Sequence, residues 1–131
     1  IPADQNHCLP LNQDPTVLIY QWVEQRLTAL EKAGIAPARL IFDPGIGYGK
    51  TAEQSLEIIK NISLFHALGI RLLVGHSRKS FLTQFTTQPA AKRDLETMII
   101  SLHLAQQTVD YLRVHNVEAN TRSLHVLKAL A

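Results

Sequence analysis

The chain has 131 residues, of which 46% are hydrophobic and 18% charged, and its net charge is +2. These values are typical of one globular domain or part of one, and the lack of a Lys and Arg cluster argues against nucleic acid or an anionic membrane as a partner. No apolar run is long enough to span a bilayer and no secretory signal pattern is present, so a cytoplasmic protein is predicted.

Residues 1–13 are polar and show no apolar periodicity, so we predict a loop or mobile segment there. Because the sequence opens with Ile1 rather than Met, we expect that it enters the protein partway through. Cys8 is the single cysteine, which rules out an internal disulfide, and we expect no redox or zinc-binding role for it.

The first predicted helix begins after Asp14, which suits an N-cap, with Pro15 at its first position and Gly34 as its left-handed stop. Trp22 lies beside the apolar face of this helix, and we expect it to pack in the core rather than against a ligand. The residues of that face recur at steps of four, four and three: Ile19, Val23, Leu27 and Leu30.

The segment from Leu40 to Thr51 reads LIFDPGIGYGKT and carries the first candidate site. Its apolar start predicts a strand that ends at Asp43, because Pro44 cannot donate a hydrogen bond to a sheet. The glycines that follow permit a left-handed backbone and the close approach of a ligand. A carboxylate at a strand end before a glycine-rich turn and a helix start is typical of α/β ligand sites.

Two nucleotide-binding motifs fit this segment only in part. Gly49, Lys50 and Thr51 match the end of a Walker A loop, but Pro44 occupies the place of its first glycine. The dinucleotide fingerprint counted from Gly45 places its last glycine on Lys50. A glycine-rich connector that binds nothing therefore remains an alternative at this point.

Thr51 and Gln54 form a potential capping box that opens a helix over about residues 52–68, which Gly69 ends. Its buried face is predicted to comprise Ile58, Ile62 and Phe65. A second strand follows over residues 71–75 and leads directly into five polar or charged residues: His76, Ser77, Arg78, Lys79 and Ser80. Polar residues gathered at the end of a buried strand are difficult to explain by folding alone.

A short helical turn at Phe81 and Leu82 and a polar connector lead to a helix over about residues 92–107, whose inward face should comprise Leu95, Met98 or Ile99, and Leu102. A third strand over residues 111–114 carries Arg113 and ends at His115 and Asn116. The last helix, about residues 118–130, should bury Leu124, Leu127 and Leu130. The remaining histidines on helices are expected to be surface or packing residues: His66, His103 and His125.

Strands and helices thus alternate, which predicts an α/β fold with a parallel sheet and right-handed crossovers. The carboxyl ends of parallel strands open on one side of a sheet, so Asp43, residues 77–80, Arg113 and His115 should meet at one rim. Arg113 suits a phosphate or carboxylate and Asp43 suits a ring with an amino group beside an N–H, so an anionic ligand is favoured. A surface cluster of ion pairs is the alternative.

Three segments carry a resemblance to a known family: LIFDPGIGYGK, LLVGHSRKSF and LRVHNV. In that order, and with helices between them, they resemble the second half of bacterial dihydropteroate synthase, the folate-pathway enzyme that sulfonamides inhibit. The resemblance runs from about Asp14 to the end. It implies a partial (β/α)8 TIM barrel, in which residues 14–131 supply the last three βα units with a preceding helix and the N-terminal strands are absent.

The resemblance also implies a reaction and its two principal residues. Dihydropterin-CH2-pyrophosphate and 4-aminobenzoate would be joined to dihydropteroate, with release of pyrophosphate. Asp43 would bind the amino and N–H edge of the pterin. Lys79 would lie between the pterin carbonyl and the incoming aminobenzoate. These two are the implied catalytic residues.

Five further positions are implied to bind the substrates. Ser80 would bind the aminobenzoate carboxylate, and Tyr48 would lie near its ring. Arg113 and His115 would hold the pyrophosphate, and Gly75 would let the pterin pack against the strand end. Mg2+ would assist the departure of pyrophosphate, with its protein ligand in the N-terminal part and none in this chain.

Two positions depart from the family's pattern. Asn116 stands where the family usually has Asp, which alters the surroundings of His115. Gln107, Thr108 and Val109 stand where a Gly-Ala pair usually closes a helix, so that helix end must be made in another way.

As it stands, the chain is expected to be inactive by itself and to self-associate as a homodimer that covers open sheet edges. A pterin-dependent methyltransferase, a P-loop nucleotide hydrolase and a non-catalytic pterin-binding or interaction fragment are the competing interpretations. The methyltransferase has no reason to keep Lys79, Ser80, Arg113 and His115.

Overall fold

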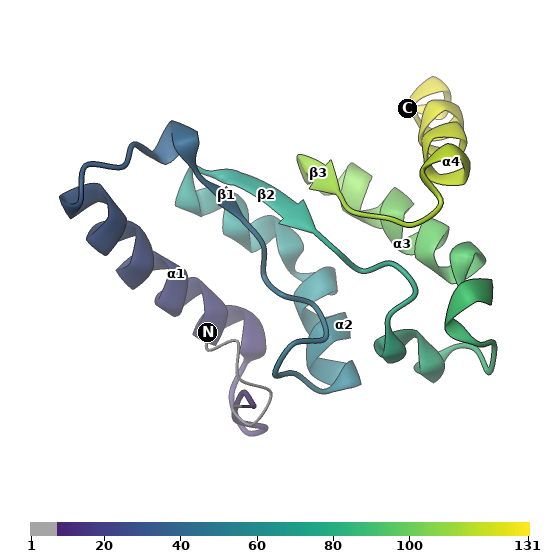
Figure 1. The fold of residues 1–131 in the computed structure, drawn as a ribbon, viewed down its shortest axis with the longest axis horizontal. Coiled ribbons are helices and arrows are strands. Elements are labelled where there is room, and N and C mark those ends of the chain that lie inside the picture. The colour runs from purple at the N-terminus through teal and green to yellow at the C-terminus, as the bar shows by residue number, and fades with distance from the viewer. Residues whose placement is uncertain (1–7) are drawn as a thin grey trace.

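The computed structural model describes residues 8–131, which form a small parallel sheet packed against helices (Figure 1). Four α-helices are described, α1 (Pro15–Lys32), α2 (Ala52–Lys60), α3 (Asp94–Gln106) and α4 (Val117–Leu130). The strands are β1 (Ile41–Phe42), β2 (Arg71–Val74) and β3 (Tyr111–Leu112). Short 3-10 helices fill the connections: η1 (Pro37–Arg39), η2 (Ile62–Leu68), η3 (Ser80–Gln84) and η4 (Ala90–Lys92).

The three strands are parallel and ordered β1-β2-β3, as the alternation of elements predicted. Phe42 pairs with Leu72, and Val74 pairs with Leu112. The backbone N–H of Arg113 also donates to the Val74 oxygen at 3.0 Å, so Arg113 lies next to the carboxyl end of β2. The prediction that all three strand ends open on one side is therefore confirmed.

One face of the sheet forms the core and the other is open to solvent. Phe42, Leu72 and Val74 are buried beneath the helices, whereas Ile41 and Tyr111 are 48% and 40% exposed. Phe65 of η2 packs edge-on against Phe42, with ring centroids 5.1 Å apart. The predicted face of the second helical segment is buried as expected: Ile58, Ile62 and Phe65.

Helix α1 begins and ends as predicted. The Asp14 carboxylate accepts from the Thr16 N–H at 2.8 Å and so caps the helix. Gly34 adopts a φ of +86°, and the following N–H of Ile35 donates to the Leu30 oxygen at 3.0 Å, which satisfies a carbonyl in the last turn. The prediction for Trp22 is wrong, because this side chain is 41% exposed.

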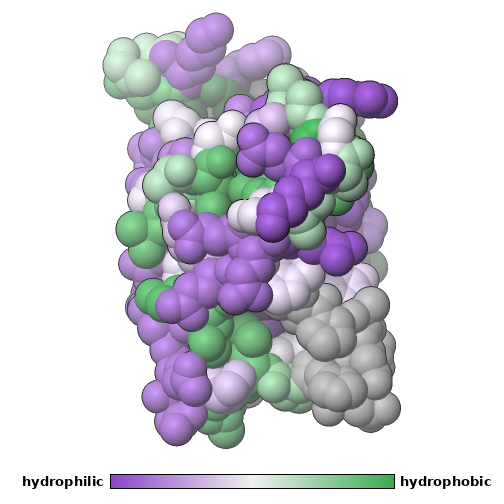
Figure 2. Space-filling view, turned by 90° about the vertical axis from the view of Figure 1, so that its left-hand side faces the viewer, coloured by the Kyte–Doolittle hydropathy of each residue, from purple (hydrophilic) through white to green (hydrophobic). Residues whose placement is uncertain are grey.

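Figure 2 shows the side of the molecule that carries α1, where hydrophobic residues are scattered among hydrophilic ones.

Residues 8–13 form no helix or strand, but two of them are anchored by hydrogen bonds. The Leu9 N–H donates to the Gly49 oxygen at 2.9 Å, and the Gln54 amide donates to the carbonyls of Leu9 and Pro10. The predicted mobile segment otherwise falls on residues 1–7, which lie outside the described residues.

The single helix predicted over residues 52–68 is two helices. Asn61 ends α2 because its side-chain amide donates to the Glu57 carbonyl oxygen and to the Glu57 carboxylate, both at 2.9 Å. This local hydrogen bonding competes with continuation of the α-helix, and η2 follows with tighter turns.

The predicted inward face of α3 is wrong at Leu95 and Ile99, whereas Met98 and Leu102 are half-buried. Leu95 and Ile99 are 62% and 60% exposed, and the buried positions are Thr97, Ser101 and Leu104. Apolar residues surround most of this helix, so their spacing did not distinguish its faces. In α4 the Leu130 side chain is also exposed, at 79%, whereas Asn120 is buried.

The end of α3 has the geometry that glycine usually supplies, formed here by Thr108. Thr108 has a φ of 60°, its N–H donates to the Ala105 oxygen, and the Val109 N–H donates to the Leu104 oxygen at 3.1 Å. This is the double hydrogen bond of a left-handed helix end. The chain therefore keeps this end with a β-branched residue at the left-handed position.

Candidate functional site

The glycine-rich loop after β1 is held in shape by its own polar groups. Asp43 accepts from the Gly45 N–H through Oδ1 at 2.9 Å. Lys50 Nζ donates to the backbone oxygens of Gly45 and Tyr48, each at 2.8 Å. The loop bends through three glycines with positive φ: Gly45, Gly47 and Gly49. The predicted capping box of Thr51 and Gln54 then starts α2.

Asp43 and Arg113 meet across the end of β2. Arg113 Nη2 lies 3.5 Å from Asp43 Oδ2. Gly75 lies beneath the guanidinium, and a Cβ added to Gly75 would come within 2.5 Å of Nη2. The missing side chain at residue 75 therefore creates the space that Arg113 occupies.

Lys79 reaches the same rim from the loop after β2. Its Nζ donates to the Ile46 carbonyl oxygen at 2.6 Å and lies 4.9 Å from the centre of the Tyr48 ring. Partial burial lowers the pKa of Lys79; the Asp43 carboxylate opposes this shift and the Arg113 charge adds to it. Lys79 is thus a partly desolvated cation held against the glycine-rich loop.

Ser77 orients His115, a role that the sequence did not predict. The backbone N–H of His115 donates to Ser77 Oγ at 3.1 Å, and the same Oγ lies 2.7 Å from the ring atom His115 Nδ1. The Ser77 hydroxyl therefore contacts both the backbone and the ring of His115 and fixes the orientation of the imidazole. The only signal in the sequence was a small polar residue just after a buried strand.

These side chains border a cavity of about 200 Å3 lined by Gly75, Ser77, Lys79, Arg113, Val114 and His115. Four of the seven predicted site residues line it, namely Gly75, Lys79, Arg113 and His115. Asp43 and Tyr48 join the group through Arg113 and Lys79. Ser80 is exposed at the start of η3 and does not line the cavity.

Lys50 is a second cation that sequence reasoning did not assign to the site. Burial lowers its pKa to about 8, with Asp43 raising the value and Lys79 lowering it. The sequence singled out Lys50 only as part of an incomplete Walker A loop. In the structure Lys50 Nζ instead holds the loop by donating to two of its carbonyl oxygens.

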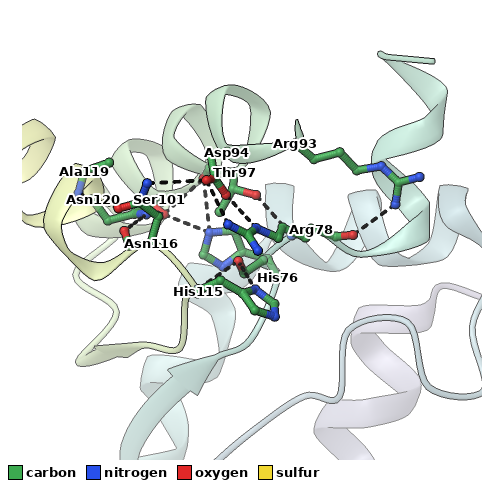
Figure 3. A network of polar contacts seen from close by, with 11 residues as sticks. His76, Arg78, Arg93, Asp94, Thr97, Ser101, His115, Asn116, Ala119 and Asn120 are labelled. Atoms are coloured by element: carbon green, nitrogen blue, oxygen red, sulfur yellow. Dashed lines mark hydrogen bonds and ion pairs between the residues drawn. The ribbon is translucent and has the colours of Figure 1, made fainter. Parts of the chain in front are cut away.

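His76 belongs to a buried network behind the site (Figure 3). Its Nε2 lies 2.9 Å from Ser101 Oγ and 3.2 Å from the Thr97 carbonyl oxygen. Because a carbonyl only accepts, the proton of the neutral ring is on Nε2. Ser101 in turn donates to Asn120 Oδ1 at 2.6 Å. Burial lowers the pKa of His76 to about 4, so the ring is uncharged at neutral pH.

Among residues 8–131, no three His, Cys, Asp or Glu side chains gather where they could hold a metal ion. Asp43 instead has cationic neighbours, Lys50, Lys79 and Arg113. These residues do not fit a magnesium site. No helix in the described part of the chain has the length and apolar character to cross a membrane.

Comparison with known proteins identifies related sequences and structures. A sequence model described as pterin binding enzyme matches residues 3–115. The folate synthesis bifunctional protein of Chlamydia caviae is 44% identical over 81% of this chain, which covers 24% of that protein.

Two crystal structures share the fold over 99% of this chain. The dihydropteroate synthase of Anaplasma phagocytophilum with bound 6-hydroxymethylpterin-monophosphate matches with a TM-score of 0.88 and 36% identity, over 51% of its length. The Xanthomonas albilineans dihydropteroate synthase with 4-aminobenzoic acid matches with a TM-score of 0.90 and 30% identity, over 46% of its length. The chain therefore spans about half of each solved structure.

Proposed function

Because the chain belongs to the pterin-binding enzyme family, we propose that residues 14–131 form the C-terminal part of a dihydropteroate synthase. The full-length enzyme joins dihydropterin-CH2-pyrophosphate to 4-aminobenzoate. The observation that carries the proposal is the meeting of Asp43, Lys79 and Arg113 at one rim of the sheet. One acceptor and two cations there match a ring with donor groups and an anionic tail.

Asp43 recognises the pterin in this proposal. A carboxylate can accept hydrogen bonds from an exocyclic amino group and the adjacent ring N–H in one plane. Asp43 Oδ1 already accepts from Gly45, which fixes the orientation of the carboxylate, and its side chain remains 34% exposed. Gly75 provides room for the flat ring to pack against the end of β2.

Arg113 and His115 bind the pyrophosphate. The Arg113 guanidinium lies over Gly75, so the pterin ring displaces it from this position as it enters. The side chain is 59% exposed and its contact with Asp43 is long, so little free energy opposes the movement. Arg113 then exchanges a carboxylate of the protein for a phosphate of the substrate.

Lys79, Tyr48 and Ser80 receive the aminobenzoate. Lys79 Nζ lies over the Tyr48 ring, 4.9 Å from its centre, so a cation and an aromatic ring are held together where the benzoate would bind. Ser80 follows Lys79 at the start of η3 and binds the carboxylate. Its exposure is compatible with a substrate that arrives after the pterin.

The reaction is a substitution at the pterin methylene carbon. The bond from this carbon to the pyrophosphate oxygen breaks, and pyrophosphate leaves with the electron pair. The aminobenzoate nitrogen supplies its lone pair to the same carbon and loses a proton. Such a reaction needs positioned substrates and stabilised leaving-group charge, which a rim with Arg113, His115 and Lys79 provides.

We place the protein ligand of the proposed Mg2+ in the N-terminal part of the enzyme, because the Asp43 carboxylate at this rim already has cationic neighbours, Lys50, Lys79 and Arg113. Homodimer formation also remains a proposal. The open face of the sheet exposes Ile41 and Tyr111, which another part of the barrel or a second copy would cover.

Product formation tests the function. The full-length protein is incubated with dihydropterin-CH2-pyrophosphate and labelled 4-aminobenzoate, and dihydropteroate is separated and counted. We expect dihydropteroate to form only when the pterin substrate carries its pyrophosphate group. A sulfonamide should suppress this product by competing with 4-aminobenzoate. Binding of the pterin without product would instead favour a non-catalytic pterin-binding protein, and methyl transfer from a folate substrate would favour the methyltransferase.

A further inference from the structure

The residue before Lys79 has an unusual backbone. Arg78 has a φ of 59°, in the left-handed region that non-glycine residues seldom adopt. This conformation is strained for a residue with a Cβ. It turns the chain between Ser77, which orients His115, and Lys79, which enters the cavity.

Residues at the start of α3 bind the backbone N–H, the carbonyl oxygen and two guanidinium nitrogens of Arg78 (Figure 3). The guanidinium binds the Asp94 carboxylate through two hydrogen bonds, Nε to Oδ1 at 2.8 Å and Nη2 to Oδ2 at 3.0 Å. The Arg78 N–H donates to Thr97 Oγ1 at 3.1 Å, and its carbonyl accepts from Arg93 Nη1 at 3.0 Å. We refer to Arg93, Asp94 and Thr97 as the Arg78 clamp.

The clamp also reaches the loop after β3. Asn116 Nδ2 lies 3.4 Å from Asp94 Oδ2, and Asn116 Oδ1 accepts from the Ala119 N–H at the start of α4. Asn116 directly follows His115 in the chain. Asp94 thus connects the loop that carries Lys79 with the loop that carries His115.

We propose that Asp94 is a positioning residue that keeps Arg78 in its left-handed conformation and so directs Lys79 into the cavity. The inference rests on the proposed function for its kinetic consequences and on geometry alone for the placement of Lys79. If the Arg78–Asp94 contact were an ordinary, partly exposed ion pair, its loss would change stability little and would not change the reaction rate. A displacement of about 1 Å at a reacting group can cost on the order of 100-fold in rate.

Glycine at residue 78 separates this role from a general structural one. Glycine adopts positive φ without strain, so the turn before Lys79 keeps its direction with little help from the clamp. Loss of the Asp94 charge should therefore lower kcat in the native sequence and lower it much less after Arg78→Gly. A purely structural contribution of Asp94 to α3 would be the same in both backgrounds.

The experiment uses the full-length protein with four changes: Asp94→Asn, Arg78→Gly, both together, and Glu118→Gln as a control. Glu118 is an exposed acid in the first turn of α4 and lies outside the clamp. We expect Asp94→Asn to lower kcat by about 10-fold to 100-fold with a KM for the pterin substrate changed less than about threefold. Adding Asp94→Asn to Arg78→Gly should lower kcat by less than about threefold more.

A second readout does not require catalysis. The reactivity of each lysine toward acetic anhydride is measured against pH by mass spectrometry, with exposed Lys60 as the internal reference. The lowered pKa of Lys79 should rise toward that of an exposed lysine in Asp94→Asn and stay lowered in Glu118→Gln. This result is obtained even if the protein makes no dihydropteroate, which would reject the proposed function alone.

The inference is overturned if Asp94→Asn matches Glu118→Gln in both kcat and Lys79 titration, or if its kcat effect is the same in the Arg78→Gly background. Should Asp94→Asn fail to fold, Thr97→Val tests the same clamp. It removes only the acceptor of the Arg78 N–H and keeps the shape of a fully buried side chain. It should shift the Lys79 titration in the same direction, and an unchanged titration would count against the clamp.

Discussion

Asp43 and Arg113 come within 3.5 Å of each other above Gly75, although β2 separates the strands that carry them. The contact exists because a glycine ends the middle strand and leaves the rim open. In the proposed enzyme the pterin enters through the same opening and displaces the Arg113 side chain from its position over Gly75. The residue without a side chain is therefore as important to the site as the charged ones.

A side chain at residue 75 should obstruct the site without unfolding the protein. In Gly75→Ala the new Cβ meets Arg113, whose flexible end can move, so we expect the free energy of unfolding to change by less than about 1 kcal/mol. Affinity for the pterin pyrophosphate should fall at least about 10-fold, because the methyl group remains where the ring packs. Calorimetry and urea unfolding measure the two quantities.

Arg113→Ala provides the control for that variant. If Gly75→Ala acted only by pushing Arg113 away, it would have no further effect on pterin affinity in the Arg113→Ala background. We expect a further loss there, since the ring itself contacts the added methyl group. Equal pterin affinities of Arg113→Ala and of the double variant Gly75→Ala/Arg113→Ala would contradict contact between the pterin and residue 75.

Removal of the Lys79 amine should abolish most of the activity. Lys79→Ala in the full-length enzyme is expected to lower kcat/KM by roughly 100-fold to 1,000-fold, because the cation stands where both substrates meet. Its Tm should change little, as Nζ makes a single hydrogen bond to the Ile46 oxygen. Lys60→Ala, on an exposed helix end, is the matched control and should keep full activity. Unchanged turnover in Lys79→Ala would remove this residue from the mechanism.

Acid should destabilise the protein through His76. Burial holds its pKa at about 4, below the ordinary 6.5, so the unfolded chain binds a proton that the folded chain refuses. Stability from this group is complete above about pH 6.5 and falls as the pH approaches 4. The loss between neutral pH and about pH 5 should be about 2 kcal/mol.

Urea unfolding of His76→Gln at several pH values checks this expectation. The variant should lose stability at neutral pH, because His76 Nε2 bonds to Ser101, but its stability should depend less on pH. His125→Gln, on the exposed side of α4, should follow the native curve. An equally steep acid loss in His76→Gln would show that another group is responsible.

The left-handed backbone at Thr108 should carry measurable strain. Thr108 has a φ of 60°, so Thr108→Gly should be more stable than Thr108→Ala by about 1 kcal/mol. The alanine variant is the reference because both changes remove the hydroxyl that lies 3.0 Å from His66 Nε2. Thermal unfolding compares them directly, and equal Tm values would mean that the left-handed backbone carries no strain.

Local signals in the sequence predicted much of this fold. Asp14, Gly34 and Thr51 act within a few residues of their own position, so the helix ends that they make were predictable. The order of parallel strands followed from alternation, and it brought Asp43, Lys79 and Arg113 together as predicted. Binding roles for these residues remain predictions.

What the sequence did not predict depends on contacts between distant segments. The buried face of α3 contains Thr97 and Ser101 because the loop after β2 places His76 and Arg78 against them. Spacing of apolar residues contains no information about such polar partners. The roles of Ser77 and Lys50 were missed for the same reason, since each is defined by the atoms that it meets.

A crystal structure of the full-length protein with a bound pterin tests the central claim most directly. We expect the amino and N–H edge of the ring to donate to the Asp43 carboxylate, with the ring over Gly75 and Arg113 moved away from Gly75. Lys79 Nζ should then lie beside the ring carbonyl. A pterin bound elsewhere, with Arg113 still over Gly75 and paired with Asp43, would contradict the assignment of this rim as the active site.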